Sequence, residues 1–350
     1  MKLSDFDYIL PKEFIAQEPL KERDNSKLMV LNRDDSSINH HSFFDLPDLI
    51  DSNSVLVFNQ SKVIPARLKF PLGNGHAEIL LIKKIKDDTW ECMVHPGKKF
   101  QPQSTIELDK ECSAHIKSIT PHGLREIEFK CDDFTKYLKE KGHTPTPPYI
   151  KKEVEDSNRY QTVYAKNEGS VAAPTAGFHF TPELLDKLRS KGVQTEFVTL
   201  HVGLGTFQAV KTDEIKDHNM HSEWFELEEE VANRLNKAKK DGKKIIAVGT
   251  TSVRVLESCT EGAIPSSNCD EGAIPLSRIT AQSGETNIFI YPGYKWKFVD
   301  ELITNFHVPK STLLMLVSSF ASQEYILKAY EKAKENKYRF FSFGDSMWIR

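Results

Sequence analysis

The sequence contains no apolar stretch long enough to span a membrane, and its amino terminus, MKLSDFDYILPKEF, lacks the apolar core of a secretion signal. Only five of its 350 residues are cysteines, an odd number without a Cys-x-x-Cys pair. This scarcity argues against a disulfide framework or a structural zinc site, and for a reducing compartment. The net charge of −3 excludes a polycation. We therefore expect a soluble, cytoplasmic protein.

Two catalytic signatures are also missing. There is no HExxH motif, and we expect no metal site, because separate segments carry the candidate ligands His179, His201, His218, His221 and His307. The absence of a GxSxG turn weakens the case for a serine hydrolase. The abundant His, Thr, Asn and Lys side chains suit general acid–base chemistry on a polar substrate.

The chain is long enough for two domains and, with 39% hydrophobic residues, can bury a large core. Strand and helix patterns alternate over 1–65 and 153–350, including a strand at 288–291 and a final strand and turn at 338–345. This alternation predicts a parallel or mixed sheet covered by helices, a discontinuous α/β catalytic domain. Short alternating stretches over 66–152 predict an inserted domain that is a small β-barrel or a sandwich.

Charge is divided unevenly along the chain. Residues 62–152 contain 17 Lys and Arg against 12 Asp and Glu, a surplus of +5, whereas the remainder has a net charge of −8. A basic module on an acidic body is typical of nucleic-acid binding. A solvated lysine-rich face explains the same composition, and charge alone favours this simpler interpretation.

The most informative segment is 171–207, VAAPTAGFHFTPELLDKLRSKGVQTEFVTLHVGLGTF. Thr181 before Pro182 predicts a helix N-cap with proline at the first helical position, and Gly192 predicts the end of that helix. Phe197–Val202 predicts a strand. The segment is therefore a loop, a helix, a strand and a second loop with little slack between them.

Four polar loops carry the chemistry. Residues 176–179 and 201–206 both combine glycine with His or Thr, a mixture that allows a close backbone approach and supplies hydrogen-bonding groups. Residues 59–62 follow an apolar strand and form either a ligand-binding tip or an ordinary turn. Residues 249–252 follow another strand and either bind an anion at a helix start or form a plain turn. They lack the lysine and the spacing of a P-loop.

Long strings in this sequence resemble the S-adenosylmethionine:tRNA ribosyltransferase-isomerase family. They include GSVAAPTAGFHFTPELL, VTLHVGLGTF, HNMHSEWFEL, IIAVGTTSVRVLES, LITNFHVPKSTLLMLVSSFA and YRFFSFGD, and the resemblance covers essentially the whole chain. The departures are His95 in place of arginine, Val308 in place of leucine, and a duplicated EGAIP at 261–265 and 271–275. His95 puts one RNA contact in doubt.

The resemblance implies an αβα layered domain with an inserted β-barrel. It also implies a reaction in which the ribosyl part of S-adenosylmethionine is transferred to 7-aminomethyl-7-deazaguanine in a tRNA anticodon. The ribose is isomerised to an epoxycyclopentanediol, which gives epoxyqueuosine and releases adenine and methionine. This chemistry needs a base near the sugar C5′ and an acid that protonates the departing adenine. It needs no metal or other cofactor, and S-adenosylmethionine itself is a substrate rather than a cofactor.

Candidate roles follow from the loops and the resemblance together. The acid–base candidates are His179, His201 and Glu223. The candidates for binding S-adenosylmethionine or the target base are Asn59, Ser61, Thr175, Gly177, Gly203, Gly205, Thr206, Thr250, Thr251, Arg254, Asn305, His307 and Lys310. Within that set, Thr250, Thr251 and Arg254 are expected at the methionine carboxylate, and Asn305, His307 and Lys310 at the ribose or the target base. Each has a structural alternative, such as a buried histidine or a helix-capping threonine.

The expected partners are tRNA and S-adenosylmethionine, with no membrane, and the expected state is a monomer. The candidate tRNA-binding residues are Lys62, Arg67, Lys98, Lys99, Lys151 and Lys152. Two other classes stay open at this point. A non-catalytic RNA-binding protein would bind tRNA without releasing adenine, and a metal hydrolase would be silenced by chelators.

Overall fold

The computed structural model describes residues 1–152, 156–203, 210, 212–261 and 277–350, and it divides into two compact units. The large unit comprises Met1–Ser61, Pro148–Asn167 and Ala173–Arg350, and the small unit comprises Lys62–Pro147 and Glu168–Ala172. The candidates Gly205 and Thr206 and nearly all of the EGAIP duplication lie outside the described residues.

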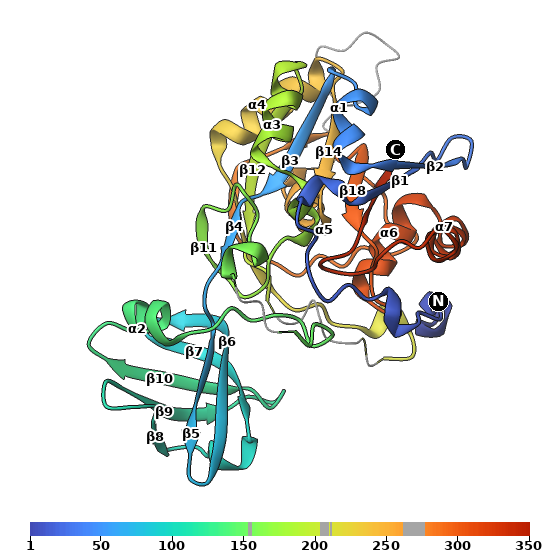
Figure 1. Cartoon of the computed structure of the whole chain (residues 1–350). Helices are drawn as coiled ribbons and strands as arrows, with labels where there is room; N and C mark the ends of the chain where they lie inside the picture. Colours follow the sequence, from blue (N-terminus) through green and yellow to red (C-terminus); the bar gives the residue numbers. More distant parts are fainter. Residues whose placement is uncertain (153–155, 204–209, 211, 262–276) are drawn as a thin grey trace. The chain divides into compact units, whose positions relative to one another are not determined.

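The large unit is built on a nine-stranded mixed sheet with the order β17-β13-β12-β3-β14-β18-β19-β1-β2 (Figure 1). Its centre, β12-β3-β14-β18, is parallel, and the strands on either side are partly antiparallel. The strands are β1 (Lys27–Leu31), β2 (Ile38–Ser42), β3 (Ser54–Asn59), β12 (Gln194–Leu200), β13 (Glu223–Leu227), β14 (Lys244–Val248), β17 (Gln282–Thr286), β18 (Glu301–Asn305) and β19 (Ser346–Ile349). A small sheet in this unit pairs β15 (Thr260–Glu261) with β16 (Arg278–Ile279). Another pairs β4 (Ser61–Val63) with β11 (Asn167–Ser170), most of whose residues belong to the small unit. The predicted mixed α/β class is confirmed.

Helices accompany this sheet along the chain. The α-helices are α1 (Leu46–Leu49), α3 (Pro182–Ser190), α4 (Glu229–Lys240), α5 (Thr250–Ser258), α6 (Thr312–Ala321) and α7 (Gln323–Glu335). The 3₁₀ helices are η1 (Leu3–Phe6), η2 (Lys12–Phe14), η3 (Arg23–Asn25), η4 (Phe43–Asp45), η6 (Ser157–Tyr160), η7 (Thr175–His179) and η9 (Ile215–Asp217). Among the described helices, none combines the length and the hydrophobicity needed to cross a membrane.

The core of the large unit lies against β3, whose six residues are all buried. Leu56 and Phe58 of this strand pack with Leu184, Leu185 and Leu188 of α3 in one apolar cluster. Successive side chains of a strand point to opposite faces, so a strand buried at every position is covered on both faces. Continuous apolar runs such as 55–58 are therefore explained by a central position in the sheet.

The segment 171–207 folds largely as its sequence predicts. Thr181 caps α3, with its hydroxyl accepting from the Leu184 backbone N–H at 3.1 Å, and Pro182 is the first helical residue. Gly192 follows the helix with φ of +95°, a conformation that side chains other than glycine rarely adopt. The next strand, β12, begins at Gln194 rather than at Phe197, because parallel pairing with β3 extends it into polar residues.

Two predicted strands are wrong. Residues 288–291 form no strand, because β17 ends at Thr286, whose side chain accepts from the Ile288 backbone N–H at 3.2 Å. Residues 338–345 do not form the predicted strand either, because Phe341 has φ of +69°, which an extended strand excludes. The final strand is instead β19.

The small unit is a curled six-stranded antiparallel sheet with the order β5-β6-β7-β10-β9-β8. The strands β5 and β8 are its edges and do not pair with one another, so the sheet is a half-barrel rather than the closed barrel that the sequence predicts. Its elements are β5 (Arg67–Leu72), β6 (Gly75–Lys86), β7 (Thr89–His95), η5 (Gly97–Lys99), β8 (Thr105–Glu107), β9 (Cys112–Ile119), β10 (Arg125–Cys131) and α2 (Phe134–Lys141).

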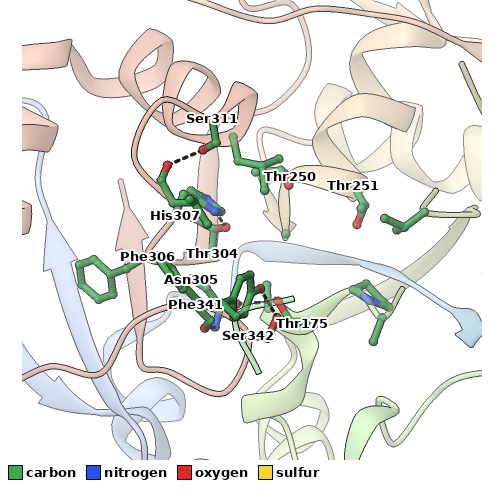
Figure 2. Close-up of a pocket in the computed structure, with 18 residues that line it drawn as sticks. Thr175, Thr250, Thr251, Thr304, Asn305, Phe306, His307, Ser311, Phe341 and Ser342 are labelled. Carbon is green, nitrogen blue, oxygen red and sulfur yellow. Dashed lines mark hydrogen bonds between the residues drawn. The ribbon is translucent and has the colours of Figure 1, made fainter. Parts of the chain in front are cut away.

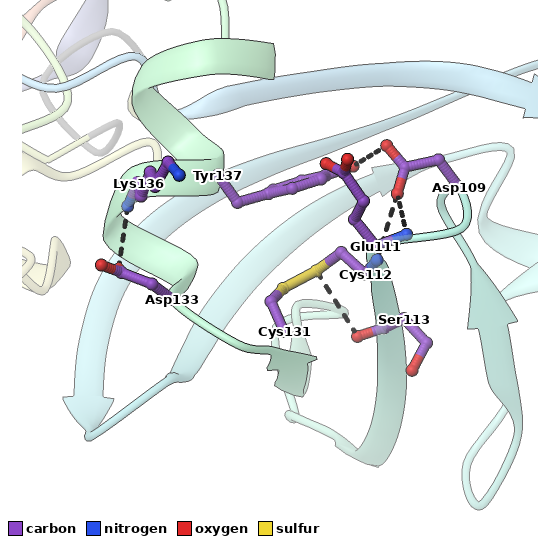
Figure 3. The surroundings of a disulfide bond; sticks show 8 residues. All are labelled: Asp109, Glu111, Cys112, Ser113, Cys131, Asp133, Lys136 and Tyr137. Carbon is purple, nitrogen blue, oxygen red and sulfur yellow. Dashed lines mark hydrogen bonds between the residues drawn. A yellow bond between two sulfur atoms is a disulfide. The ribbon is translucent and has the colours of Figure 1, made fainter.

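A disulfide joins Cys112 to Cys131 in the small unit (Figure 3). The argument against a disulfide framework, from the odd cysteine count and the lack of a Cys-x-x-Cys pair, did not anticipate this bond. The pairing follows from strand register, because Cys112 in β9 lies opposite Cys131 in β10 with a Cα–Cα distance of 4.6 Å. Asp109 accepts from the Cys112 backbone N–H and from the Tyr137 hydroxyl, which holds the turn beside the bond. Cys92 and Cys259 are buried free thiols.

The charge difference between the units is smaller than the linear sequence predicts. Lys151 and Lys152 belong to the large unit, and Glu168 belongs to the small unit. The small unit therefore contains 15 Lys and Arg against 13 Asp and Glu, a surplus of +2 rather than +5. Its total charge is a weak argument for RNA binding, and individual lysines matter more.

Candidate active site

A cleft of about 650 Å³, partly open to solvent, lies in the large unit where β14 and β18 end (Figure 2). Ligands of open α/β sheets gather at the carboxyl ends of parallel strands, and these two strands are parallel neighbours. The polar side chains that line the cleft belong to Tyr149, Thr175, Thr250, Thr251, Thr304, Asn305, His307, Ser311 and Ser342. No Asp, Glu, Lys or Arg is among the described lining residues, so the site suits an uncharged, hydroxyl-rich group.

The amino terminus of α5 forms one wall of the cleft. Gly249, with φ of +86°, turns the chain from β14 into this helix, and a Cβ there would lie 3.3 Å from the Ala176 Cβ. The first N–H groups of a helix lack partners within the helix and favour an anion. The Thr251 hydroxyl is buried at the same place and has no hydrogen-bond partner among the described residues. Backbone N–H groups at a helix start and an unused hydroxyl are both groups that can donate to a carboxylate.

The end of β18 supplies a fixed imidazole. His307 lines the cleft, and its Nε2 lies 3.1 Å from the Thr304 hydroxyl. Its backbone N–H donates to the Tyr330 hydroxyl at 2.8 Å, and its carbonyl accepts from the Tyr8 hydroxyl. Burial lowers the pKa of His307 to about 3, so the ring is neutral at pH 7.

Asn305 is held in one orientation by its surroundings. Its Nδ2 donates to the Phe341 carbonyl at 3.1 Å, and because a carbonyl only accepts, this contact identifies the nitrogen. The same nitrogen lies 3.3 Å from His179 Nε2, and Oδ1 accepts from Thr175 at 3.5 Å. Phe341 reaches this position with φ of +69°, a strained conformation of the kind found at functional sites.

His179 lies behind the cleft rather than in its lining. Because Asn305 donates to Nε2, the ring proton belongs on Nδ1, which lies 2.7 Å from the Ser26 hydroxyl. Burial, followed by the charges of Arg339 and Arg23, lowers the pKa of His179 to about 3. The ring is therefore neutral at pH 7, and both of its nitrogens are occupied. These contacts favour a positioning role for His179, and its catalytic role stays a prediction.

His201 also lies outside the described lining of the cleft. Its Nδ1 is 2.7 Å from the Ser61 hydroxyl, and its ring stacks on Trp224 with centroids 5.0 Å apart. Burial lowers the pKa of His201 to about 4. Asn59, nearby, donates to the Leu200 carbonyl and accepts from two backbone N–H groups, so its amide clamps β3 to β12.

Glu223 and Arg254 form a buried ion pair with each other. Glu223 also accepts from the Gly203 backbone N–H at 2.7 Å, and Arg254 donates to the Thr286 carbonyl at 3.1 Å. Burial lowers the pKa of Arg254 to about 10. Neither side chain lines the cleft, so the structure does not bring Arg254 to the carboxylate site at the start of α5.

Two other candidates are explained by local structure. A Cβ on Gly177 would lie 1.9 Å from the Tyr164 hydroxyl, so packing requires a glycine there. The Lys310 ammonium lies 2.6 Å from Asp7 at the surface of the large unit. Of the substrate-binding candidates, the cleft therefore brings together Thr175, Thr250, Thr251, Asn305 and His307.

The tRNA-binding candidates fall into two groups. Three have acidic partners: Lys62 pairs with Glu168, Arg67 with Glu78, and Lys152 with Glu18. Lys98 and Lys99 are exposed on η5, and Lys151 is exposed in the large unit; none of the three forms an ion pair with a described residue.

Several lining residues were missed by sequence reasoning. Tyr149 follows a proline-rich run at 144–148, and its hydroxyl bonds the Ser342 hydroxyl at 2.7 Å. Ser311 caps α6, and Phe341 and Ser342 lie in the segment predicted as a strand. The only sequence signal for them was their density of aromatic and hydroxyl side chains.

No group of three or more His, Cys, Asp or Glu side chains in the described part of the chain is placed to hold a metal ion. The expectation of a metal-free site stays a prediction.

Comparison with known proteins identifies the family. A family model described as queuosine biosynthesis protein matches residues 3–349. Proteins named S-adenosylmethionine:tRNA ribosyltransferase-isomerase from Finegoldia magna and Halothermothrix orenii are 50% and 48% identical to this chain. The alignments cover 100% of this chain and 98% and 100% of those proteins.

A solved structure agrees with these relatives. The crystal structure of an S-adenosylmethionine tRNA ribosyltransferase from Thermotoga maritima is 36% identical, with a TM-score of 0.56, over 99% of this chain and 100% of that one. The match over the full length of both chains includes the segments that form the cleft. This chain therefore belongs to the queuosine biosynthesis family of S-adenosylmethionine:tRNA ribosyltransferase-isomerases.

Proposed function

We propose that this enzyme transfers the ribosyl moiety of S-adenosylmethionine to 7-aminomethyl-7-deazaguanine in tRNA and isomerises it, giving epoxyqueuosine and releasing adenine and methionine. The observation that carries the proposal is the uncharged cleft with the start of α5 in its wall. Its hydroxyls, amide and imidazole suit ribose and a nucleobase.

The methionine end of S-adenosylmethionine is assigned to the start of α5. A carboxylate there accepts from the first backbone N–H groups of the helix and from the Thr251 hydroxyl, which is buried without another partner. A buried hydroxyl without a partner costs free energy, so a ligand oxygen that bonds it gains more than one that meets an already satisfied group. Thr250 lines the same wall.

We assign two lining groups to the chemistry at the sugar and at adenine. Burial lowers the pKa of His307 to about 3, so its ring is unprotonated at pH 7; it is a weak base, and the sugar proton that it accepts is the one that the neighbouring sulfonium acidifies. Burial raises the pKa of Tyr149 to about 12, so its hydroxyl stays protonated at pH 7 and assists the departing adenine as a hydrogen-bond donor. Pairs of titratable groups whose environments separate their pKa values are typical of acid–base sites. Asn305, held by His179 and Phe341, orients the ribose or the target base.

The proposal extends to the state of the protein. We expect a monomer that works in the cytoplasm, where its tRNA substrate is made. We also expect the large unit to form a layered αβα sandwich, which the burial of every residue of β3 supports.

The direct test is a reaction with S-adenosylmethionine and tRNA that carries 7-aminomethyl-7-deazaguanine. Adenine is measured by chromatography, and the modified nucleoside by mass spectrometry of digested tRNA. We expect both products in equal amounts, and neither when the tRNA carries unmodified guanine. Adenine release without nucleoside modification would contradict the proposal.

Chelator and metal content provide a second test. We expect full activity without added metal and in the presence of a chelator. Stoichiometric zinc whose removal abolishes adenine release would contradict this expectation and revive a metal-dependent mechanism.

A further inference from the structure

A second cavity, of about 300 Å³ and partly open to solvent, lies beside the cleft in the large unit. Three arginines from distant segments line it: Arg23, Arg159 and Arg339. His179 and Ser26 also line it, and Ser342 lines both this cavity and the cleft. We refer to it as the arginine cavity. None of the three arginines is among the candidate site residues named from the sequence, although Arg339 lies in the string YRFFSFGD.

The positive charge of the arginine cavity is largely uncompensated. Arg23 donates to the carbonyls of Phe178 and Asn158, and Arg159 donates to the carbonyls of Leu20 and Lys21. Among the described residues, neither forms an ion pair with a carboxylate.

Arg339 alone has an acidic partner, Asp345, at 3.6 Å. Burial and then the charge of Arg159 lower the pKa of Arg23, and Asp156 offsets this only in part. Like charges brought together in a half-buried cavity cost free energy that an anionic ligand would recover.

The arrangement fits a phosphate better than a carboxylate. A carboxylate is satisfied by one arginine fork, whereas the oxygens of a phosphate accept from several guanidinium groups at once. The backbone carbonyls that hold Arg23 and Arg159 fix these side chains in advance, which lowers the entropy lost on binding. The start of α5 already offers a separate place for the carboxylate of S-adenosylmethionine.

We infer that the arginine cavity binds a backbone phosphate of the RNA strand that carries the target base. The inference rests on the proposed function, because it takes tRNA as the substrate. Since Ser342 separates the two cavities, a phosphate in one and a base in the other can belong to the same or adjacent nucleotides. Single-stranded RNA loops present splayed bases and phosphates in this way. The phosphate contact then positions the strand, and the cleft reads the base.

The test measures tRNA binding by the Arg23→Gln/Arg159→Gln double variant over a series of salt concentrations. We expect at least a 10-fold weaker affinity and a salt dependence shallower by about 0.7 to 0.9 for the one lost phosphate contact. Affinity for S-adenosylmethionine should stay at the wild-type value. The matched control is Arg189→Gln, an exposed arginine of α3 outside both cavities, which should bind tRNA like wild type.

A second variant guards against misfolding. Arg23→Lys/Arg159→Lys keeps both charges but loses the planar forks, so it should keep the salt dependence and bind with intermediate affinity. Unchanged tRNA affinity and salt dependence in the glutamine variant would overturn the inference. Weaker S-adenosylmethionine binding with normal tRNA binding would also overturn it, because the cavity would then hold part of S-adenosylmethionine rather than an RNA phosphate.

The two proposals fail separately. If wild-type protein releases no adenine yet the double variant loses tRNA affinity, the proposed reaction is wrong and the phosphate site stands. If wild-type protein modifies tRNA and the double variant binds it normally, only the phosphate site is wrong.

Discussion

The two units use polar groups in opposite ways. The large unit buries its polar groups and keeps them uncharged where the cleft lies, with imidazoles, an amide and hydroxyls fixed by hydrogen bonds. The small unit is a half-barrel that exposes lysines at η5 and gains stability from a cross-strand disulfide. Buried neutral groups set geometry, whereas exposed charges act at a distance and are screened by salt. Chemistry is therefore expected from the cleft of the large unit. Weak, salt-screened attraction of tRNA is expected from the exposed lysines of the small unit, in addition to the phosphate contact proposed at the arginine cavity of the large unit.

Acid should destabilise the large unit strongly. Burial lowers the pKa of His179 and His307 to about 3 and of His201 to about 4, below the usual value for histidine. A lowered pKa means that the unfolded chain binds these protons first, so stability is complete above about pH 6.5 and falls as pH drops towards 4. Together, the three histidines should change the free energy of unfolding by up to about 4 kcal/mol per pH unit near pH 5.

Urea unfolding of a Trp90→Phe variant measures this effect, because the remaining tryptophans, Trp224, Trp296 and Trp348, all belong to the large unit. Adding His179→Gln should reduce the pH dependence by about 1.4 kcal/mol per unit, the contribution of one proton. An unchanged pH dependence would show that His179 is not buried as a neutral ring.

Asn305→Asp should abolish most turnover. The substitution keeps the shape but removes the donor that bonds the Phe341 carbonyl and His179, and it places a charge in an uncharged cleft. We expect adenine release to slow by ~100-fold or more, the scale of a lost group in an acid–base site. The control is Asn287→Asp on an exposed segment. Equal rates of adenine release in the two variants would show that Asn305 takes no part in the reaction.

Reduction of the disulfide should affect the small unit alone. The Cys112–Cys131 bond closes a loop with a sequence separation of 19, for which loop entropy predicts about 3 kcal/mol of stabilisation. Trp90 is buried in this unit, so its fluorescence in a variant lacking the other tryptophans reports the unit's unfolding with and without dithiothreitol. A Cys112→Ser variant should not respond to dithiothreitol. If wild type does not respond either, the bond is absent in solution.

His179 distinguishes a positioning role from proton transfer. Gln can accept from Asn305 and donate to Ser26, so His179→Gln should keep adenine release within about 10-fold of wild type. His179→Leu should lose ~100-fold, because it leaves both partners unsatisfied. Equal loss in the two variants, with unchanged melting temperatures, would support proton transfer by His179.

The smallest effects are expected from the lysines. Lys98→Gln/Lys99→Gln should weaken tRNA binding a few-fold and flatten its salt dependence by about 0.7 for each lost phosphate contact. Lys151→Gln/Lys152→Gln should do less, because Lys152 pairs with Glu18. If neither pair changes the affinity or the salt dependence, both are solvated surface.

Local patterns predicted the parts of the fold that neighbouring residues determine. The α3 cap at Thr181, the buried run in β3 and the glycine before α5 follow from side-chain chemistry within a few positions. Contacts between distant segments could not be predicted from these local patterns. The register of β9 and β10 pairs Cys112 with Cys131, and the fold gathers Arg23, Arg159 and Arg339 around one cavity.

The same limit applies to the candidate site. Several of the predicted polar loops meet at one cleft, as expected for polar turns at the ends of strands. They carry Thr175, Thr250, Thr251, Asn305 and His307. The direction in which each side chain points was not predictable, because it depends on partners such as Ser26 for His179 and Glu223 for Arg254.

A crystal structure with S-adenosylmethionine bound would show where the substrate lies. We expect the ligand in the cleft, with its carboxylate at the start of α5 within about 3.2 Å of the Thr251 hydroxyl and its ribose beside Asn305 and His307. We expect no part of this ligand in the arginine cavity. A ligand whose carboxylate contacts Arg23 or Arg159, or which binds beside His201 and Glu223 instead, would contradict this expectation.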